Sequence, residues 1–379
     1  MKLTVIKGVF TWGLITCFIG SGNAENLPKE IEGFSFEASY IGDNVNNLAG
    51  GIKTGLSYLG MANMMLTIDT KNIGLWMGGK FYVNAANTHG GQPSLNLTGD
   101  VQVLSNIEAG DHTFLQEVWY KQKLGRTAIT IGLQDLNVEF ANSAYGAFYL
   151  NSSFGILPII SNNFTASIFP LTTMGITCKW NASDKTTWVN AAYDGSPTNF
   201  DYNPYNLRWQ LNSGDGLLLI SELQKSAQIK NLPGVYKAGV YAHFHIQKNI
   251  PDSLINQLLG FYVYADQTVW EHAERSAGLF LQLGYTPSVE STNNFYFGSG
   301  INVSGVFNKK ANDTLGLAVA HVEFTHDKRK ETTFELSYQY RISQHIFIQP
   351  DVQYIIHPSG TAVALPNALT ANFRFGFSI

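Results

Sequence analysis

The feature that most constrains the fold is an alternation of apolar and polar residues that recurs from Phe34 to the end of the chain. In the last segment the apolar positions are Leu369, Ala371, Phe373, Phe375, Phe377 and Ile379. Between 331 and 342 they are Thr332, Phe334, Leu336, Tyr338 and Tyr340. Successive side chains of a strand point to opposite faces, so this period of two predicts strands with one apolar and one polar face.

About sixteen such segments of roughly ten residues follow one another, separated by clusters of Gly, Asn, Asp, Pro and Ser. A water-soluble β-sandwich alternates in the same way, and composition separates the two classes. Charged residues make up only 14% of the chain and aromatic residues 13%, whereas a soluble protein usually carries about a quarter charged residues. We therefore predict an all-β fold, a transmembrane antiparallel β-barrel of about sixteen strands.

The N-terminus predicts export. Lys2 and Lys7 precede an apolar stretch over residues 8–19, and small residues follow up to Ala24. This is the pattern of a signal peptide over residues 1–24, which leaves 25–379 as a single barrel domain. The apolar stretch is too short to cross about 30 Å of hydrocarbon as an anchor helix, and Thr16 is a poor residue before a lipidated Cys17. Cys178 is then the one remaining cysteine, so no intramolecular disulfide is expected.

Composition and motifs argue against several function classes. The net charge of −4 gives no nucleic-acid footprint. His243 and His245 share a strand face, but no carboxylate or cysteine stands beside them at metal-ligand spacing. The chain has no glycine-rich phosphate loop, nucleophile elbow or CxxC pair. We therefore expect neither a metal nor a cofactor, and no catalytic residues.

Three segments are too long for ordinary connections: 87–111, 136–170 and 195–214. They are expected to be outer loops, or a loop folded into the bore.

Several strings also occur in an order typical of one family. They include Gly55–Gly60, Gly132–Phe140, Phe148–Gly155 and Gln349–Ile355, the last with Pro350 inside a regular strand pattern. On these strings the chain resembles the OprB-type carbohydrate-selective porins over nearly its whole mature length. Two features depart from the family: Ile379 ends the chain where an aromatic residue is usual, and the segment 195–214 matches weakly.

The resemblance implies a porin of the bacterial outer membrane through which carbohydrates, mono- and small oligosaccharides, diffuse passively into the periplasm. It implies a constriction loop at 136–170 folded into the bore. It also implies outer-membrane lipid and the barrel assembly machinery as partners, and it leaves monomer and homotrimer open.

Candidate solute-binding residues come from positions expected to face the bore, because sugars need hydrogen-bonding groups and aromatic faces. Around 114–122, Glu117, Trp119 and Lys121 are expected in the lumen, opposite Phe114, Val118 and Tyr120. The full set of expected solute-binding residues is Glu117, Trp119, Lys121, Asp135, Asn137, Glu139, Asn151 and Asp351.

Each of these candidates has a plainer alternative. The first three could form a solvated wall, with Trp119 packed under a loop. Asn151 could stabilise a structural turn, and Asp351 could serve cross-strand pairing. For the whole protein, the alternatives are a general diffusion porin, an outer-membrane barrel enzyme with a Ser/His or Asp/His pair, and a soluble glycan-binding β-protein.

Overall fold

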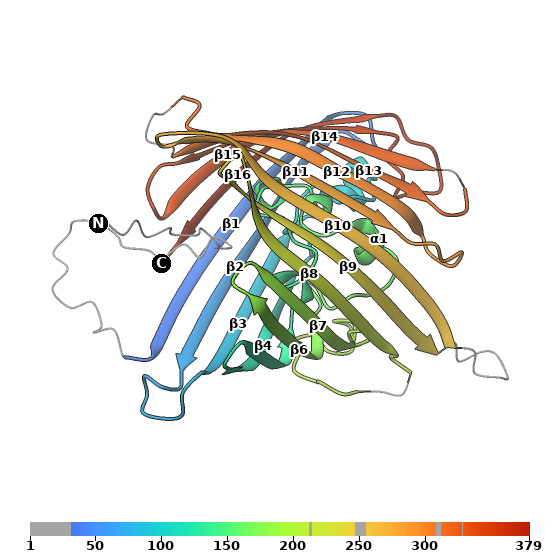
Figure 1. Cartoon of the computed structure of the whole chain (residues 1–379). Coiled ribbons are helices and arrows are strands. Elements are labelled where there is room, and N and C mark those ends of the chain that lie inside the picture. Colours follow the sequence, from blue (N-terminus) through green and yellow to red (C-terminus); the bar gives the residue numbers. More distant parts are fainter. Residues whose placement is uncertain (1–31, 212–213, 247–254, 308–311, 328) are drawn as a thin grey trace.

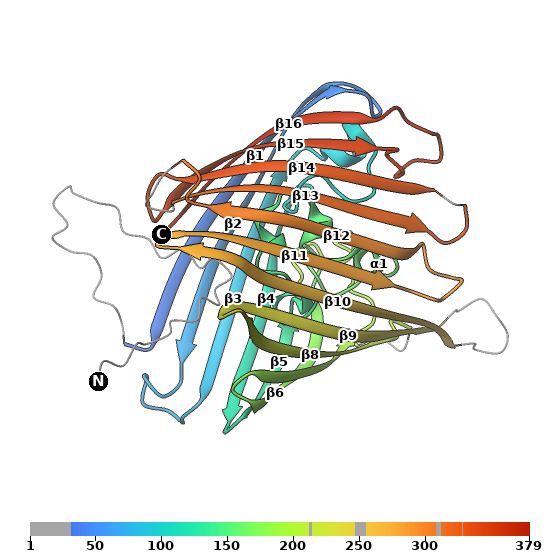
Figure 2. The same ribbon diagram turned by 45° about the horizontal axis from the view of Figure 1, so that its top comes forward.

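The chain was analysed as a computed structural model that describes residues 32–379 apart from 212–213, 247–254, 308–311 and 328. The predicted signal peptide, 1–24, lies outside the described residues. Within the described part, sixteen strands form a closed antiparallel barrel (Figure 1, Figure 2). They are β1 Phe34–Ala49, β2 Gly55–Asp69, β3 Gly79–Gly90, β4 His112–Leu124, β5 Thr127–Gln134, β6 Thr173–Ser183, β7 Thr186–Asp194, β8 Leu217–Ile229, β9 Leu232–Ile246, β10 Ile255–His272, β11 Arg275–Tyr285, β12 Asn293–Ser304, β13 Asp313–Phe324, β14 Lys330–Arg341, β15 Ile346–Ile356 and β16 Ala368–Ser378.

Each strand pairs with its neighbours in the chain, and β1 pairs with β16 to close the sheet. This confirms the predicted antiparallel barrel of about sixteen strands. At the closure Arg374 lies opposite Asp43, and its guanidinium donates to both carboxylate oxygens at 2.7 Å. Both side chains are buried inside the barrel. Because side chains alternate along a strand, this pair fixes which residues of β1 and β16 face inward.

The two ends of the barrel differ in their connections. Chain reversals of two residues, at 125–126, 184–185, 230–231 and 273–274, lie at the end where β1 begins and β16 ends. The opposite end carries 91–111, 135–172 and 195–216. These agree with the three long segments expected from the sequence, except that residues 87–90 belong to β3. Short turns on one side and long loops on the other are typical of outer-membrane barrels, with the short turns in the periplasm.

The outer wall is apolar. Leu219, Leu279, Leu317 and Leu336 point outward and are 40–53% exposed. Pro350 also lies on this wall, and the pairing of β14 with β15 is interrupted beside it, between Ser337–Asp351 and Tyr340–Ile348. An interruption is expected because proline has no backbone N–H to donate to a neighbouring strand.

Glycines on the inner wall make room for tyrosine rings of the neighbouring strand. Tyr262 covers Gly239, and Tyr241 covers Gly260, so closely that an added Cβ would lie within 2.1–2.2 Å of a ring carbon. Such close approach requires glycine. The rings are thereby held flat against the wall and fill the space between the wall and the loops.

Short helices shape the long connections. They are η1 Ser94–Thr98, η2 Leu136–Val138, η3 Gly146–Phe148, η4 Ser152–Phe154 and α1 Pro158–Ser161. Among the described residues, no helix is long and apolar enough to span a membrane. The largest buried apolar cluster joins Phe140, Phe154 and Ile159 of the 135–172 connection to Tyr241, Phe280 and Tyr296 of the inner wall. The core therefore lies inside the barrel, where Figure 2 shows α1 and the segments around it.

Candidate functional site

The long connection after β5, residues 135–172, is fixed inside the barrel by buried carboxylates of the wall. Glu222 of β8 accepts from the amide N of Ala141 at 2.8 Å, and Asp266 of β10 accepts from Ala144 N at 2.8 Å. Glu335 of β14 accepts from the amide N atoms of Leu150 and Asn151 at 2.6 and 3.0 Å. Charged acceptors make strong hydrogen bonds, so backbone amides of the connection are tied to three separate strands.

Polar side chains of the same wall donate to carbonyl groups of the connection. Tyr296 Oη donates to Ser153 O at 2.8 Å, and Gln282 Nε2 donates to Phe154 O at 2.8 Å. The neighbouring connection, 91–111, is held in the same manner, since Glu331 accepts from Val101 N and Gln102 N at 2.9 and 3.0 Å. We call β8–β12 and β14–β16 the anchored wall, because their inward residues bond to these two connections.

A different set of side chains faces the bore from β3, β4 and β6. We call it the open face, and it consists of Lys80, Tyr82, Trp119, Lys121, Lys123 and Lys179. Strand pairing places them on one side of the sheet, since Tyr82 lies opposite Trp119, and Lys80 opposite Lys121. All six are half-buried or exposed. The open face is thus a part of the inner wall that is left uncovered near the short-turn end.

The aromatic pair at its centre is well defined. The rings of Tyr82 and Trp119 stack with centroids 4.8 Å apart and planes 25° apart. Trp119 Nε1 donates to Glu117 Oε1 at 3.1 Å, and Lys121 Nζ lies 5.0 Å from the centre of the Trp119 ring. Glu117 itself is only 8% exposed. It therefore orients the indole rather than forming part of the bore surface.

Glu139, from the 135–172 connection, lies over the edge of the open face. It forms ion pairs with Lys121 at 3.3 Å and with Lys179 at 2.7 Å. Burial alone would raise the pKa of Glu139, but the two ammonium groups more than offset this and lower it. The carboxylate is thus held ionised between two lysines at the place where the connection meets the wall.

A β-bulge corrects one expectation. The pairing of β3 with β4 shifts by one residue, so that Asn84 lies opposite Glu117 but Ala85 lies opposite Leu115. Gln116 is the extra residue, and the inward face changes from even to odd numbers there. Phe114 therefore faces the interior, where it packs on Phe200 at 5.0 Å, and not the outer wall as predicted.

Two residues that were expected to contact solute, Asn151 and Asp351, are buried in the structure. Asn151 is 0% exposed, and its Oδ1 accepts from Ser153 N while its Nδ2 donates to Gln353. Asp351 is 3% exposed and accepts from Asn372 Nδ2 at 2.8 Å. Both side chains are enclosed between the anchored wall and the connection, so a solute in the bore does not reach them.

Asp135 and Asn137 are half-buried and bond within the connection. Asp135 accepts from Asn137 N at 2.9 Å and from Phe169 N at 3.1 Å, and burial raises its pKa to about 6 despite these bonds. Asn137 Nδ2 donates to the carbonyls of Phe140, Ala141 and Gly155. These residues shape the start of the connection. Of the eight expected residues, Trp119, Lys121 and Glu139 are the ones that line the bore.

Sequence reasoning missed Lys80, Tyr82, Lys123 and Lys179 as bore residues. A signal was present for the first two, since Lys80, Tyr82 and Asn84 alternate with Phe81 and Val83. Their position beside Trp119 depends on the pairing of β3 with β4, which the sequence does not state. Lys179 becomes part of the site through Glu139, from a segment 40 residues earlier in the chain.

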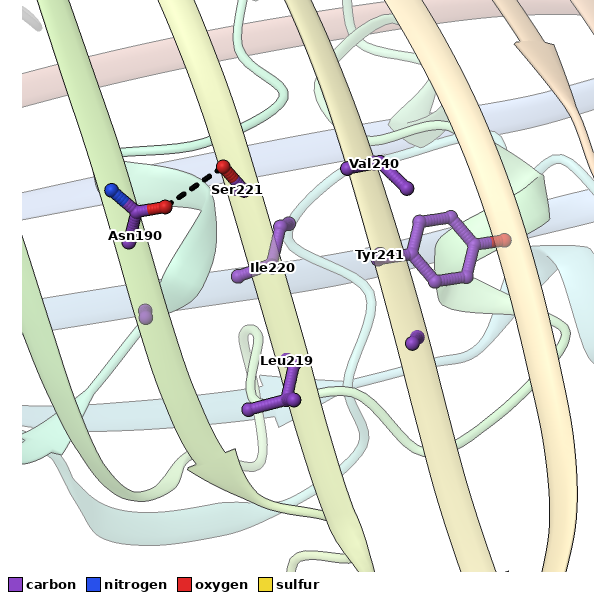
Figure 3. Close-up of a pocket in the computed structure, with 8 residues that line it drawn as sticks. Asn190, Leu219, Ile220, Ser221, Val240 and Tyr241 are labelled. Atoms are coloured by element: carbon purple, nitrogen blue, oxygen red, sulfur yellow. Dashed lines mark hydrogen bonds between the residues drawn. The ribbon is translucent and has the colours of Figure 1, made fainter.

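A separate hollow of about 300 Å³ lies on the outer wall between β7, β8 and β9 (Figure 3). Leu219 and Val240 border it and point outward, and Ser221 Oγ donates to Asn190 Oδ1 at 2.8 Å. Trp188 Nε1 donates in turn to Ser221 Oγ at 2.8 Å. Its outward side chains put the hollow on the side opposite the bore, so it is no part of the solute path.

In the part of the chain that the structure describes, no group of three or more His, Cys, Asp or Glu side chains is arranged to hold a metal ion. His243 is buried, stacks on Phe164 with ring centroids 4.5 Å apart, and contacts the carbonyl of Gly195 through Nε2 at 2.7 Å. These contacts indicate that His243 packs against the inner wall.

Comparison with known proteins gives a consistent result. The sequence pattern described as "Carbohydrate-selective porin, OprB family" matches residues 53–379. Porin B of Pseudomonas aeruginosa is 24% identical, with 94% of this chain and 89% of that protein covered. The putative porin QuiX of Acinetobacter baylyi is 22% identical, with 90% and 88% covered. The high-pH structure of Pseudomonas putida OprB superposes with a TM-score of 0.81 at 19% identity, covering 92% and 94% of the two chains.

Proposed function

The chain belongs to the OprB family of carbohydrate-selective porins, and from this premise we propose that sugars cross the bore along the open face, in contact with Tyr82 and Trp119. The protein is an outer-membrane porin for carbohydrates, and its family is one of channels rather than enzymes.

The stacked rings of Tyr82 and Trp119 are the observation that carries this proposal. A pyranose presents a flat face of C–H groups, which packs favourably on an aromatic ring. Its hydroxyl groups need donors and acceptors at the same height. Lys121 and Glu139 provide a donor and an acceptor beside the indole. Both contacts are thus offered at one place on the wall.

The 135–172 connection makes this place narrow. Its backbone is tied to β14 by Glu335, while Glu139 forms ion pairs with Lys121 of β4 and Lys179 of β6 on the far side of the barrel. The connection therefore bridges the bore, which supports its expected role as the constriction. A solute that passes it is brought against the open face.

The outer wall supports outer-membrane lipid as a partner. Outward leucines form an apolar band. Trp76, Trp180, Trp188 and Trp270 are 45–50% exposed near the short-turn end, where tryptophan is favoured at a membrane–water interface.

Planar-bilayer recording tests the proposed path. Maltose added to the bathing solution should reduce the ion current through the wild-type channel. Trp119→Ala should raise the maltose concentration for half-block by roughly 5- to 10-fold, because it removes one stacking ring worth about 1 kcal/mol or slightly more. Trp180→Ala is the matched control, since Trp180 lies on the outer wall and is 45% exposed.

The outcomes separate the alternatives. A wild-type current that no sugar reduces would leave a general diffusion porin. A sugar block that is the same in Trp119→Ala and in the wild type would place the contact elsewhere in the bore.

A further inference from the structure

The open face carries more positive charge than the fold requires. Lys80 of β3 lies directly opposite Lys121 of β4. Ala128 of β5 separates Lys123 on one side from Lys179 on the other. Like charges directly opposite each other on neighbouring strands are destabilising. Strand pairing therefore does not explain why four lysines lie together on this patch. Another reason for their presence is needed.

Among the described residues, two of these lysines have an ionic partner close by. Lys121 and Lys179 share Glu139. Lys80 and Lys123 are exposed, and within the described residues no carboxylate oxygen lies within 4.0 Å of either ammonium group. Asp69 lies opposite Lys80 on β2, but its carboxylate accepts from the amides of Lys71 and Asn72. Two ammonium groups thus remain available to a solute.

Carboxylates elsewhere in the described part of the bore form no ion pair with Lys80 or Lys123, and this includes Glu37 of β1, which interacts electrostatically with Tyr82. The buried Glu222, Glu331 and Glu335 are engaged by backbone amides of the two connections. Glu117 is enclosed beneath Trp119. On the anchored wall, the exposed Glu271 is negative and the exposed Arg341 is positive, so together they add no net charge to the bore. A bore with low-dielectric walls concentrates the field of such a patch and raises the local concentration of counter-ions.

The lysines lie beside the stacked rings. Lys121 Nζ is 5.0 Å from the centre of the Trp119 ring, and Lys80 is its cross-strand neighbour. A solute that uses both features needs a pyranose face and a negative charge on the same small molecule. We propose that this pore favours carboxylated pyranoses, the hexuronates, over neutral hexoses, with Lys80 and Lys123 binding the carboxylate. This inference rests on the proposed path along Tyr82 and Trp119.

Permeation of glucuronate and of glucose into proteoliposomes that contain the full-length mature porin tests this preference. At low ionic strength, glucuronate should enter roughly 3- to 10-fold faster than glucose, and the ratio should fall towards one as salt rises and screens the lysines. In the double variant Lys80→Gln/Lys123→Gln the ratio should fall towards one even at low salt. Lys225→Gln is the control, because Lys225 lies on the outward side of β8 and should keep the wild-type ratio.

The readouts distinguish the two proposals. If glucose enters and the wild-type ratio is one or less, the preference for hexuronates is refuted while the sugar path stands. If neither sugar enters faster than into empty liposomes, the sugar path itself fails. A high ratio that the double variant retains would refute the role of Lys80 and Lys123.

Discussion

The two sides of the bore use charge in opposite ways. The anchored wall carries carboxylates that are buried and bonded to backbone amides, such as Glu222 and Glu335. The open face carries lysines, of which Lys80 and Lys123 are exposed. A buried carboxylate that accepts from several N–H donors stabilises the fold. An exposed ammonium group, in contrast, can exchange its bound water for a solute. The same kind of inward polar residue thus serves the loop on one side and the lumen on the other.

The largest difference between the two sides should appear in stability. Arg374→Ala removes the guanidinium that bonds to Asp43, Ser105 and Asn106. It leaves Asp43, which is 0% exposed, without its counter-charge. We expect the free energy of unfolding to fall by roughly 3–5 kcal/mol. Urea titration of the barrel folded in lipid vesicles measures this change.

Lys80→Ala is the matched variant on the open face, and it should change the free energy of unfolding by no more than about 0.5 kcal/mol. Similar losses for Arg374→Ala and Lys80→Ala would mean that the two sides do not differ in the way we describe.

A smaller effect is expected at a single loop anchor. Glu222→Ala leaves the amide of Ala141 and the hydroxyl of Tyr262 without their acceptor. A buried donor that loses its partner costs roughly 1–3 kcal/mol. We also expect noisier single-channel currents, because the 135–172 connection is then held less firmly. A quiet channel of unchanged stability would show that the other anchors suffice.

The pH should act on the 91–111 connection. Burial and the neighbouring Asp100 carboxylate raise the pKa of Glu108 from its ordinary 4.5 to about 8. A raised folded-state pKa contributes stability that is fully present below pH 4.5 and is lost as the pH rises towards 8. We expect a loss on the order of 1 kcal/mol per pH unit in this range.

Unfolding titrations at pH 5.5, 6.5 and 7.5 check this slope. Glu108→Gln, which stays neutral at every pH, should make the slope shallower by about the 1 kcal/mol per pH unit that Glu108 contributes. An equally steep slope in that variant would assign the titration to other groups.

The smallest loss in the free energy of unfolding is expected at Ser221, which is next to the loop anchor Glu222 in the sequence but lies on the outer wall. Ser221 precedes Glu222 on β8 and points outward, where it bonds to Trp188 and Asn190. Side-chain hydrogen bonds between transmembrane helices contribute about 0.6 kcal/mol on average, and we take the same magnitude for this bond on the outer wall. Ser221→Ala should therefore cost about that much in the same unfolding titration. A loss as large as that of Glu222→Ala would mean that neighbouring residues on opposite faces do not differ as proposed.

The sequence predicts the strands because their signal is local. Alternation over 331–342 put Tyr338 and Tyr340 on the apolar side, and β14 has them facing outward. The bulge at Gln116 was not predictable in this way, because it is a property of the pairing between β3 and β4. It reversed the assignment of Phe114.

The site was predicted less completely, for a related reason. Inward polar residues look alike in the sequence whether they bond to a loop or to a solute. Asp351 and Asn151 were therefore expected in the lumen and lie buried instead, whereas Tyr82 became part of the site through its neighbour across the sheet.

The anchors of the 135–172 connection also set an order of events in folding. Glu335 follows the amides of Leu150 and Asn151 by 185 and 184 positions, and Glu331 follows Val101 by 230. These bonds are therefore absent until β14 has joined the sheet, and contacts between such distant segments form slowly. The narrow part of the channel is then among the last features to appear. A barrel arrested before β14 has joined would lack these bonds, while Glu222 of β8 and Asp266 of β10 would already hold part of the 135–172 connection. The complete selective channel would then arise only on closure.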